Sequence, residues 1–273
     1  MFAFLGPNGA GKTTTVEILE GYRQRTGGDV AVLDVDPDRA DGNWRARIGV
    51  VLQESEPEAE LTVKECLSLY AGYYPAPRTV EETMKLVGLE QRADQRCGRL
   101  SGGQRRRLDL GLALIGDPEL LFLDEPTTGF DPSARRAAWE VIAGLGSLGK
   151  TIFLTTHYME EAEYLADRIA VIAAGRIVAE GTPATLGSRD SQKSIIRFTV
   201  PVGADASELP AGVKAAIVGS SPGNQVELQA SKPLPLLGAL AAWSADKGLD
   251  LDDLNVSRPT LEDIYLELTR ETS

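Results

Sequence analysis

One short stretch near the start of the chain constrains the fold more than any other. Residues 6–13 read GPNGAGKT, which fits G-x-x-x-x-G-K-[ST], and they stand between an expected strand at 2–5 and an expected helix at 12–21. The glycines allow the backbone to curl so that its N–H groups face phosphate oxygens, and the helix adds the positive end of its dipole. Lys12 can reach the β- and γ-phosphates, and the Thr13 hydroxyl can ligate Mg²⁺.

This loop predicts a nucleoside-triphosphate site in an α/β domain. By itself it does not separate kinases, GTPases and motors, which share the motif. A chance glycine-rich turn is the weaker interpretation, because the loop stands between a strand and a helix as the mechanism requires. The expected phosphate-binding residues are Gly6, Pro7, Asn8, Gly9, Ala10, Gly11, Lys12, Thr13 and Thr14.

Runs rich in Val, Ile and Leu recur after the loop and alternate with helical patterns. Such near-continuous apolar runs suit strands that are covered on both faces in a parallel sheet. The expected strands are 2–5, 30–34, 48–52, 120–124, 151–156 and 168–175, and the expected helices are 12–21, 63–73, 79–87, 103–115, 133–147 and 158–166. We therefore expect an α/β fold with a mainly parallel sheet flanked by helices.

A second, smaller domain is expected after this α/β region. The stretch GSRDS near residues 187–191 predicts a boundary between domains at 1–187 and 191–273. Beyond it we expect strands at 195–200, 213–218 and 225–229, a helix at 234–246, an extended piece at 250–256 and a last helix at 260–269. This order predicts a small α+β accessory domain.

Charge and composition narrow the class of protein. Of the 273 residues 42% are hydrophobic, as expected for a protein with a sizeable core, and the net charge is −12. Nucleic-acid binding by counterion release favours a basic surface, so we expect no nucleic-acid partner. Cys66 and Cys97 fit no metal spacing, and they are interpreted as reduced thiols in a cytosolic protein.

The stretch LLFLDE at 120–125 predicts a buried strand that ends in two acids. Open α/β sheets place their sites beyond the carboxyl ends of their strands. Asp124 would hold the Mg²⁺ shell, and Glu125 could polarise a water for in-line attack on the γ-phosphate. A solvated strand end is the weaker alternative, because the phosphate loop is also present.

The stretch LSGGQ at 100–104 begins the expected helix at 103–115 and offers a second set of N–H groups and a hydroxyl for an anion. A phosphate loop, then LSGGQ, then LLFLDE resembles the ATPase cassette of ABC transporters. The resemblance extends from residue 1 to about 187 and implies a helical subdomain at about 55–117.

The same resemblance implies why one chain carries two anion sites. It implies a head-to-tail homodimer, in which the signature segment of one subunit covers the γ-phosphate that Lys12 of the other subunit holds. The signature residues expected at the nucleotide are Ser101, Gly102, Gly103 and Gln104. Residues 105–107, all arginine, then form the polar face of the signature helix and not a nucleic-acid patch.

Three further residues match the family pattern one by one. Gln53 ends the strand IGVVLQ and resembles the family glutamine that nears Mg²⁺ and the attacking water and faces the membrane partner. Asp131, in GFDP, resembles the aspartate of the family's D-loop. His157 is the one histidine of the sequence and follows TIFLTT, like the switch histidine that senses the γ-phosphate.

The stretches THYMEEAEYLADRIAVIAAG and RPTLEDIYLELT are similar to the daunorubicin or drug-resistance exporter branch of the family. That similarity implies ATP and Mg²⁺ as cofactors and an ATP-hydrolysing subunit that powers efflux of a drug-like or other hydrophobic compound. It further implies a separately encoded membrane permease, and a location at the cytoplasmic face of the cell membrane.

Two other functions agree less well with the sequence than export does. A soluble ABC protein acting on ribosomes or DNA usually carries two cassettes or a long insertion, and this sequence has one cassette, no insertion and an acidic balance. A non-catalytic regulator would have lost hydrolytic residues, which are present here. Both alternatives are therefore weaker than an exporter subunit.

The short start of the chain leads to one more expectation. Relatives usually place two strands and an adenine-stacking aromatic before the phosphate loop. We expect a truncated start, with Met1 where a GTG valine codon has been read as the first codon. Because stacking of a base on an aromatic contributes about 1–3 kcal/mol, ATP binding by such a chain would be weakened.

Overall fold

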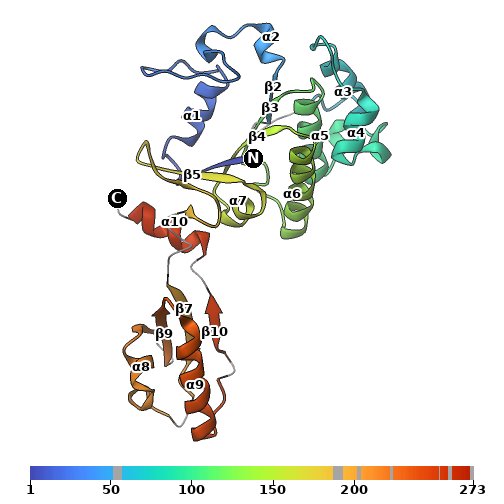
Figure 1. Cartoon of the computed structure of the whole chain (residues 1–273). Coiled ribbons are helices and arrows are strands. Elements are labelled where there is room, and N and C mark those ends of the chain that lie inside the picture. The colour runs from blue at the N-terminus through green and yellow to red at the C-terminus, as the bar shows by residue number, and fades with distance from the viewer. Residues whose placement is uncertain are drawn as a thin grey trace. The chain divides into compact units, whose positions relative to one another are not determined.

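The computed structural model describes residues 1–51, 57–186, 193–201, 204–221, 224–251, 253–257 and 260–270. The chain divides into two compact units, one from Met1 to Pro183 and one from Ala184 to Glu271 (Figure 1). Within these described ranges, no helix is both long enough and apolar enough to cross a bilayer. Each unit is considered by itself below.

The first unit is built on a six-stranded sheet with the order β2-β3-β4-β1-β5-β6. The first five strands of this order run parallel, and β6 pairs antiparallel with β5. The strands are β1 (Phe2–Leu5), β2 (Ile48–Val51), β3 (Leu120–Asp124), β4 (Thr151–Thr156), β5 (Arg168–Ala173) and β6 (Arg176–Gly181). The predicted α/β class with a mainly parallel sheet is confirmed.

Helices flank this sheet, and several begin at side-chain caps that are visible in the sequence. Reciprocal capping boxes join Thr62 with Glu65 and Thr79 with Glu82 at the starts of two helices. The helices are α1 (Lys12–Leu19), α2 (Gly42–Arg45), α3 (Val63–Ala71), α4 (Val80–Val87), α5 (Gly102–Leu114), α6 (Pro132–Ser147) and α7 (Met159–Leu165). Short 3₁₀ turns occur at Pro37–Arg39, Glu90–Arg92 and Cys97–Arg99. In Figure 1, α3, α4 and α5 lie together at one side of the unit.

Strand β3 shows why its sequence is apolar throughout. Successive side chains of a strand point to opposite faces of the sheet. Leu121 and Leu123 pack in the core that α3 to α6 cover, whereas Leu120 and Phe122 pack in the core beneath α1 and α2. Both faces are thus covered, and the first polar side chain, Asp124, stands where the strand leaves the core.

Two expectations for this unit are wrong. Residues 30–34 form no strand, because Val32 and Val35 bond to each other across a tight turn at Leu33 and Asp34, which have φ of +50° and +65°. The expected strand at 168–175 ends at Ala173, and the chain turns there into β6. Strand β6 was missed because its sequence, RIVAEG, is short, and its side chains are exposed or half-buried.

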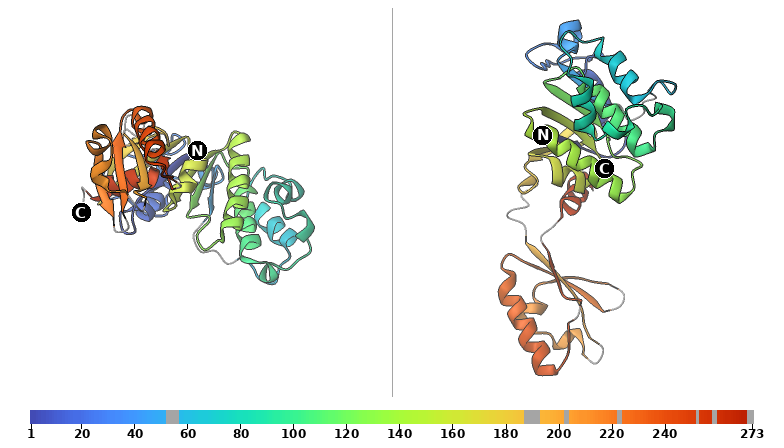
Figure 2. Two further views of the ribbon diagram at one scale, coloured as in Figure 1. Left: turned by 90° about the horizontal axis from the view of Figure 1, so that it is seen from below. Right: turned by 90° about the vertical axis from the view of Figure 1, so that its right-hand side faces the viewer.

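The second unit has the order β-α-β-β-α-β, followed by one more helix. Its four-stranded antiparallel sheet has the order β10-β7-β9-β8, which is the ferredoxin-like arrangement. Figure 2 shows α9 against one face of this sheet. The elements are β7 (Ser194–Thr199), a 3₁₀ turn (Ala206–Glu208), α8 (Ala211–Lys214), β8 (Ile217–Ser221), β9 (Gln225–Ala230), α9 (Pro233–Lys247), β10 (Asn255–Ser257) and α10 (Leu261–Arg270).

The core of this unit lies between the sheet and α9. Phe198 of β7 and Leu228 of β9 pack with Leu240 and Trp243 of α9, which agrees with the predicted α+β appendage. The expected strand at 213–218 is wrong, because its first residues belong to α8 and β8 begins only at Ile217.

Candidate functional site

The phosphate loop connects β1 to α1 and depends on its glycines. Gly9 and Gly11 have φ of +79° and +107°, which side chains other than hydrogen rarely allow. At Gly6 a Cβ would lie 2.5 Å from the carbonyl oxygen of Ile172 on β5. Among the described residues, no side chain caps the start of α1, so the first N–H groups of this helix are available for an anion.

Lys12 lies across this loop. Its Nζ donates hydrogen bonds to the carbonyl oxygens of Gly6 at 2.7 Å and Pro7 at 3.3 Å, and the residue is buried. Burial lowers the pKa of Lys12, while the nearby carboxylates of Glu125 and Asp124 act in the opposite direction. The ammonium group thus bonds to the loop and experiences the charge of the two acids that the sequence predicts at the end of β3.

These two acids are fixed by the neighbouring strand. Asp124 pairs with Thr155 of β4 in the sheet register and accepts a hydrogen bond from its hydroxyl. The N–H of Glu125 donates to the carbonyl oxygen and to the hydroxyl of Thr155, each at 3.1 Å. Glu125 has φ of +46°, a left-handed conformation that few non-glycine residues adopt.

His157 follows the adjacent strand and reaches Glu125. Its Nδ1 lies 3.3 Å from Oε2 of Glu125, the same oxygen that accepts a hydrogen bond from the Thr128 hydroxyl at 3.1 Å. Because β3 and β4 are parallel neighbours, both side chains emerge at the carboxyl edge of the sheet. The structure thus brings Lys12, Glu125 and His157 to one place.

The signature segment has a different local structure. Ser101 caps α5, with Oγ accepting from the N–H of Gln104 at 3.3 Å, and Oε1 of Gln104 accepts from the N–H of Ser101 at 3.0 Å. The Gln104 side chain is therefore part of a capping box, whereas Ser101 and Gly102 are exposed. In Figure 1, strands β2 to β4 lie between α1 and α5.

A cleft of 730 Å³ opens beside α1 and connects with the loop. Thr13 and Asp124 both line this cleft, as do Glu20, Tyr70 and Tyr74. Among the described residues, no group of three or more His, Cys, Asp or Glu could hold a metal by itself. One hydroxyl and one carboxylate suit Mg²⁺, which is usually bound by one or two protein ligands together with phosphate and water oxygens.

Comparisons with known proteins agree with this geometry. The ABC transporter family matches residues 1–128, and the family described as ABC transporter domain-containing protein-like, C-terminal domain, matches residues 194–260. The chain is 39% identical over 276 residues to a Nod factor export ATP-binding protein I of Burkholderia lata, covering 98% of this chain and 87% of the relative. The chain belongs to the ABC transporter ATP-binding family.

Two further relatives have the same character. The daunorubicin resistance ATP-binding protein DrrA2 of Streptomyces coeruleorubidus is 38% identical over 280 residues, covering 97% of this chain and 85% of the relative. A dimeric ATP-binding cassette in a post-hydrolysis state, bound to ADP and phosphate, superposes with a TM-score of 0.59 at 25% identity, covering 67% of this chain and 84% of that one. The first unit is thus an ABC cassette that binds and hydrolyses ATP.

One residue of the cassette site was missed by sequence reasoning. Arg106 lies in the arginine run of α5 that was interpreted as a polar helix face, yet its side chain is only 13% exposed. The guanidinium donates to the carbonyl oxygens of Asp124 at 3.1 Å, Glu125 at 3.4 Å and Pro126 at 3.0 Å. The weak sequence signal was that three consecutive residues of a helix point in directions about 100° apart, so residues 105–107 cannot all lie on one exposed face.

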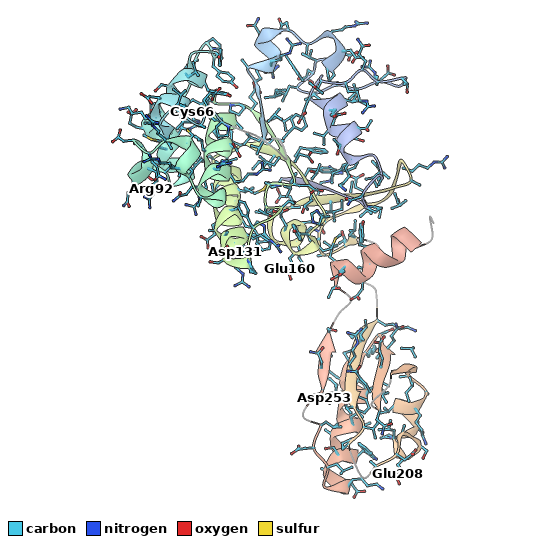
Figure 3. All side chains as sticks on the ribbon, turned by 180° about the vertical axis from the view of Figure 1, so that it is seen from behind. Cys66, Arg92, Asp131, Glu160, Glu208 and Asp253 are labelled. Atoms are coloured by element: carbon cyan, nitrogen blue, oxygen red, sulfur yellow. The ribbon has the colours of Figure 1, made fainter. Side chains whose placement is uncertain are left out.

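The remaining predicted site residues are Asp131 and Gln53. Asp131 caps α6, because its Oδ1 accepts from the N–H groups of Ser133 and Ala134, each at 2.9 Å (Figure 3). It is exposed, and among the described residues it makes no contact with the phosphate loop. Gln53 lies outside the described residues, and its predicted role stays a prediction.

Proposed function

We propose that this chain is the ATP-hydrolysing subunit of an exporter, which powers efflux of a drug-like or other hydrophobic compound through a separate membrane permease. The names of the two curated relatives, Nod factor export and daunorubicin resistance, support an export role. In this proposal the subunit works at the cytoplasmic face of the cell membrane. ATP binding closes two cassettes, and hydrolysis reopens them.

The loop from Gly6 to Thr14 binds the phosphates in this proposal. Lys12 would exchange the carbonyl oxygens of Gly6 and Pro7 for the β- and γ-phosphates, which are stronger acceptors because they are charged. Thr13 and Asp124, with Gln53, would hold Mg²⁺, which supplies charge neutralisation at the phosphates. That Thr13 and Asp124 line the same cleft supports this ligand set.

The observation that carries the catalytic proposal is the pair of Glu125 and His157, 3.3 Å apart at the carboxyl edge of the sheet. Glu125 would accept the proton of a water as the water attacks the γ-phosphorus in line, giving ADP and phosphate. His157 would donate from Nδ1 to Glu125 and lie beside the γ-phosphate, and so hold the carboxylate next to the reacting phosphate.

The signature segment would act in a second copy of the chain. Ser101, Gly102 and Gly103 begin a 13-residue helix whose N-terminus attracts an anion, and Ser101 and Gly102 are exposed. A head-to-tail homodimer would place this segment over the γ-phosphate bound by Lys12 of the other subunit, with Asp131 at the interface. The dimeric structural relative supports this arrangement.

Turnover of Glu125→Gln tests the proposal. We expect ATP turnover to fall by roughly 10²–10⁴, the usual contribution of a positioned proton acceptor, with ATP binding retained. Glu160→Gln is the matched control, because Glu160 is an exposed acid in the first turn of α7, and its turnover should stay within about twofold of wild type.

The outcomes separate the parts of the proposal. Normal hydrolysis by Glu125→Gln would contradict the assignment of the base. A wild-type chain that binds no ATP would contradict the function itself. Co-purification of the tagged chain with ribosomes, and not with a membrane protein, would contradict the export role while leaving the ATPase intact.

A further inference from the structure

Arg106 connects two parts of the cassette that are far apart in sequence. It lies on α5, five positions after Ser101, and its guanidinium reaches the backbone of residues 124–126 after β3. The three carbonyl oxygens that it contacts belong to the segment that carries Asp124 and Glu125. These three bonds go to backbone carbonyl oxygens, while the same guanidinium also lies 3.9 Å from the buried carboxylate of Asp109 on its own helix.

The backbone at this point needs such support. Glu125 has φ of +46°, and a glutamate adopts this left-handed conformation only where its surroundings hold it there. From β4, Thr155 accepts two hydrogen bonds from the N–H of Glu125. From α5, Arg106 donates to the carbonyl oxygen of the same residue. The peptide groups on both sides of the Glu125 Cα are therefore fixed by different elements.

We propose that Arg106 is a positioning residue that sets the orientation of Glu125 in its own subunit. This inference depends on the proposed role of Glu125 as proton acceptor. The physical path is short. Ser101 caps α5 and forms a capping box with Gln104, and Arg106 lies on the same helix, one turn further along. The segment that would contact ATP across the dimer interface is thereby joined to the base of its own chain.

Arginine is suited to this task and lysine is not. A guanidinium presents five N–H donors in a planar fork, so it can serve three carbonyl oxygens in a row, whereas an ammonium group is a compact charge on a flexible stem. Arg107 provides the matched control on the same helix. Its guanidinium lies beside Gly88 at the end of α4.

Steady-state kinetics give the first test. For Arg106→Gln we expect turnover to fall about 10- to 100-fold, since a misplacement of about 1 Å costs that much, while KM for ATP and nucleotide binding change less than about twofold. Arg106→Lys should recover only part of the loss, and Arg107→Gln should keep the wild-type turnover. Unchanged turnover in Arg106→Gln, or an equal loss in Arg107→Gln, would overturn the proposal.

Mixed dimers, purified through two different tags, give a test that a general loss of folding cannot imitate. The reference dimer has one wild-type subunit and one Glu125→Gln subunit. Placing Arg106→Gln in the subunit that already carries Glu125→Gln should change the rate less than about twofold, whereas placing it in the other subunit should cost the full 10- to 100-fold. Equal losses in both arrangements would overturn the proposal.

The failure of this inference differs from failure of the proposed function. If the wild-type homodimer neither binds nor hydrolyses ATP, the function is wrong. If the wild type is active and Glu125→Gln is not, but the two mixed dimers lose activity equally, the function stands and Arg106 does not position the base of its own chain.

Discussion

The two helices whose N-termini are proposed to face the nucleotide, α1 and α5, begin in opposite ways. Helix α1 follows Gly11 in the left-handed region, and no described side chain caps it. Helix α5 begins at a complete capping box of Ser101 and Gln104. The first N–H groups of α1 are therefore free to bond to an acceptor from outside the chain. At α5, one of these N–H groups already bonds to the Ser101 side chain.

This difference indicates two modes of anion binding. The loop at α1 also holds a buried ammonium group, Lys12, so it is built around a charge that one chain binds by itself. At the start of α5 the capping box of Ser101 and Gln104 supplies acceptors from within the chain. We therefore expect α1 to set ATP affinity in the monomer, and α5 to matter only when two subunits close.

The largest effect should come from the α1 side. Lys12→Ala should lower ATP affinity at least about 10²-fold, because it removes charge-assisted hydrogen bonds that contribute about 1.5–3 kcal/mol each. Titration calorimetry measures this directly. Lys150→Ala is the control, since Nζ of Lys150 pairs with Asp117 at 2.7 Å and not with the loop. Equal affinity of the two variants would contradict the comparison.

A smaller effect should separate capping from catalysis at α5. Ser101→Ala and Thr79→Ala remove the same kind of cap, from α5 and α4. Both should lose roughly 1 kcal/mol of unfolding free energy in urea titrations. Only Ser101→Ala should also lower turnover, by about tenfold or more, through loss of a hydrogen bond to a charged group. A similar loss of turnover in Thr79→Ala would mean that Ser101 acts only as a cap.

The smallest effect concerns the other end of α1. Glu20 caps its C-terminus, and its buried Oε1 has no hydrogen-bond partner among the described residues. Burial, with the nearby Asp124 and Glu17, raises the pKa of Glu20 to about 7.

The sign of the pH effect follows from this shift. The folded state holds a proton on Glu20 that the unfolded chain releases near its ordinary pKa of about 4.3. The contribution of Glu20 to stability is therefore complete below about pH 4.3 and is lost as pH rises to about 7. Glu20→Gln should abolish this loss of unfolding free energy at higher pH, which is roughly 1 kcal/mol after solvent screening. Urea unfolding at pH 5.5 and pH 8 measures it, and an identical pH trend in both proteins would contradict the assignment.

Much of the ATP site could be predicted from the sequence, because its residues belong to contiguous motifs. The loop at 6–13 and the acids after β3 follow from local patterns, and parallel strands place His157 beside Glu125. Such patterns do not show which side chains contact a different helix or strand. Arg106 was missed for this reason. It lies on α5, and the carbonyl oxygens that it contacts belong to residues 124–126, at the end of β3.

Local conformation explains the errors in the fold. The expected strand at 30–34 has the apolar residues of a strand, but Leu33 and Asp34 take positive φ, and Val32 pairs with Val35. Only the folded surroundings decide between such a turn and a strand. Gln53 was predicted from the end of β2 and the family resemblance, and it lies outside the described residues.

The central claim is that the two helix starts hold one nucleotide only when two chains come together. Sedimentation velocity of the Glu125→Gln variant, with and without MgATP, tests it most directly, because this variant should retain the nucleotide. We predict a monomer without ATP and a dimer with ATP, and we predict that adding Ser101→Ala weakens the dimer. A species that stays monomeric at saturating MgATP would contradict the account.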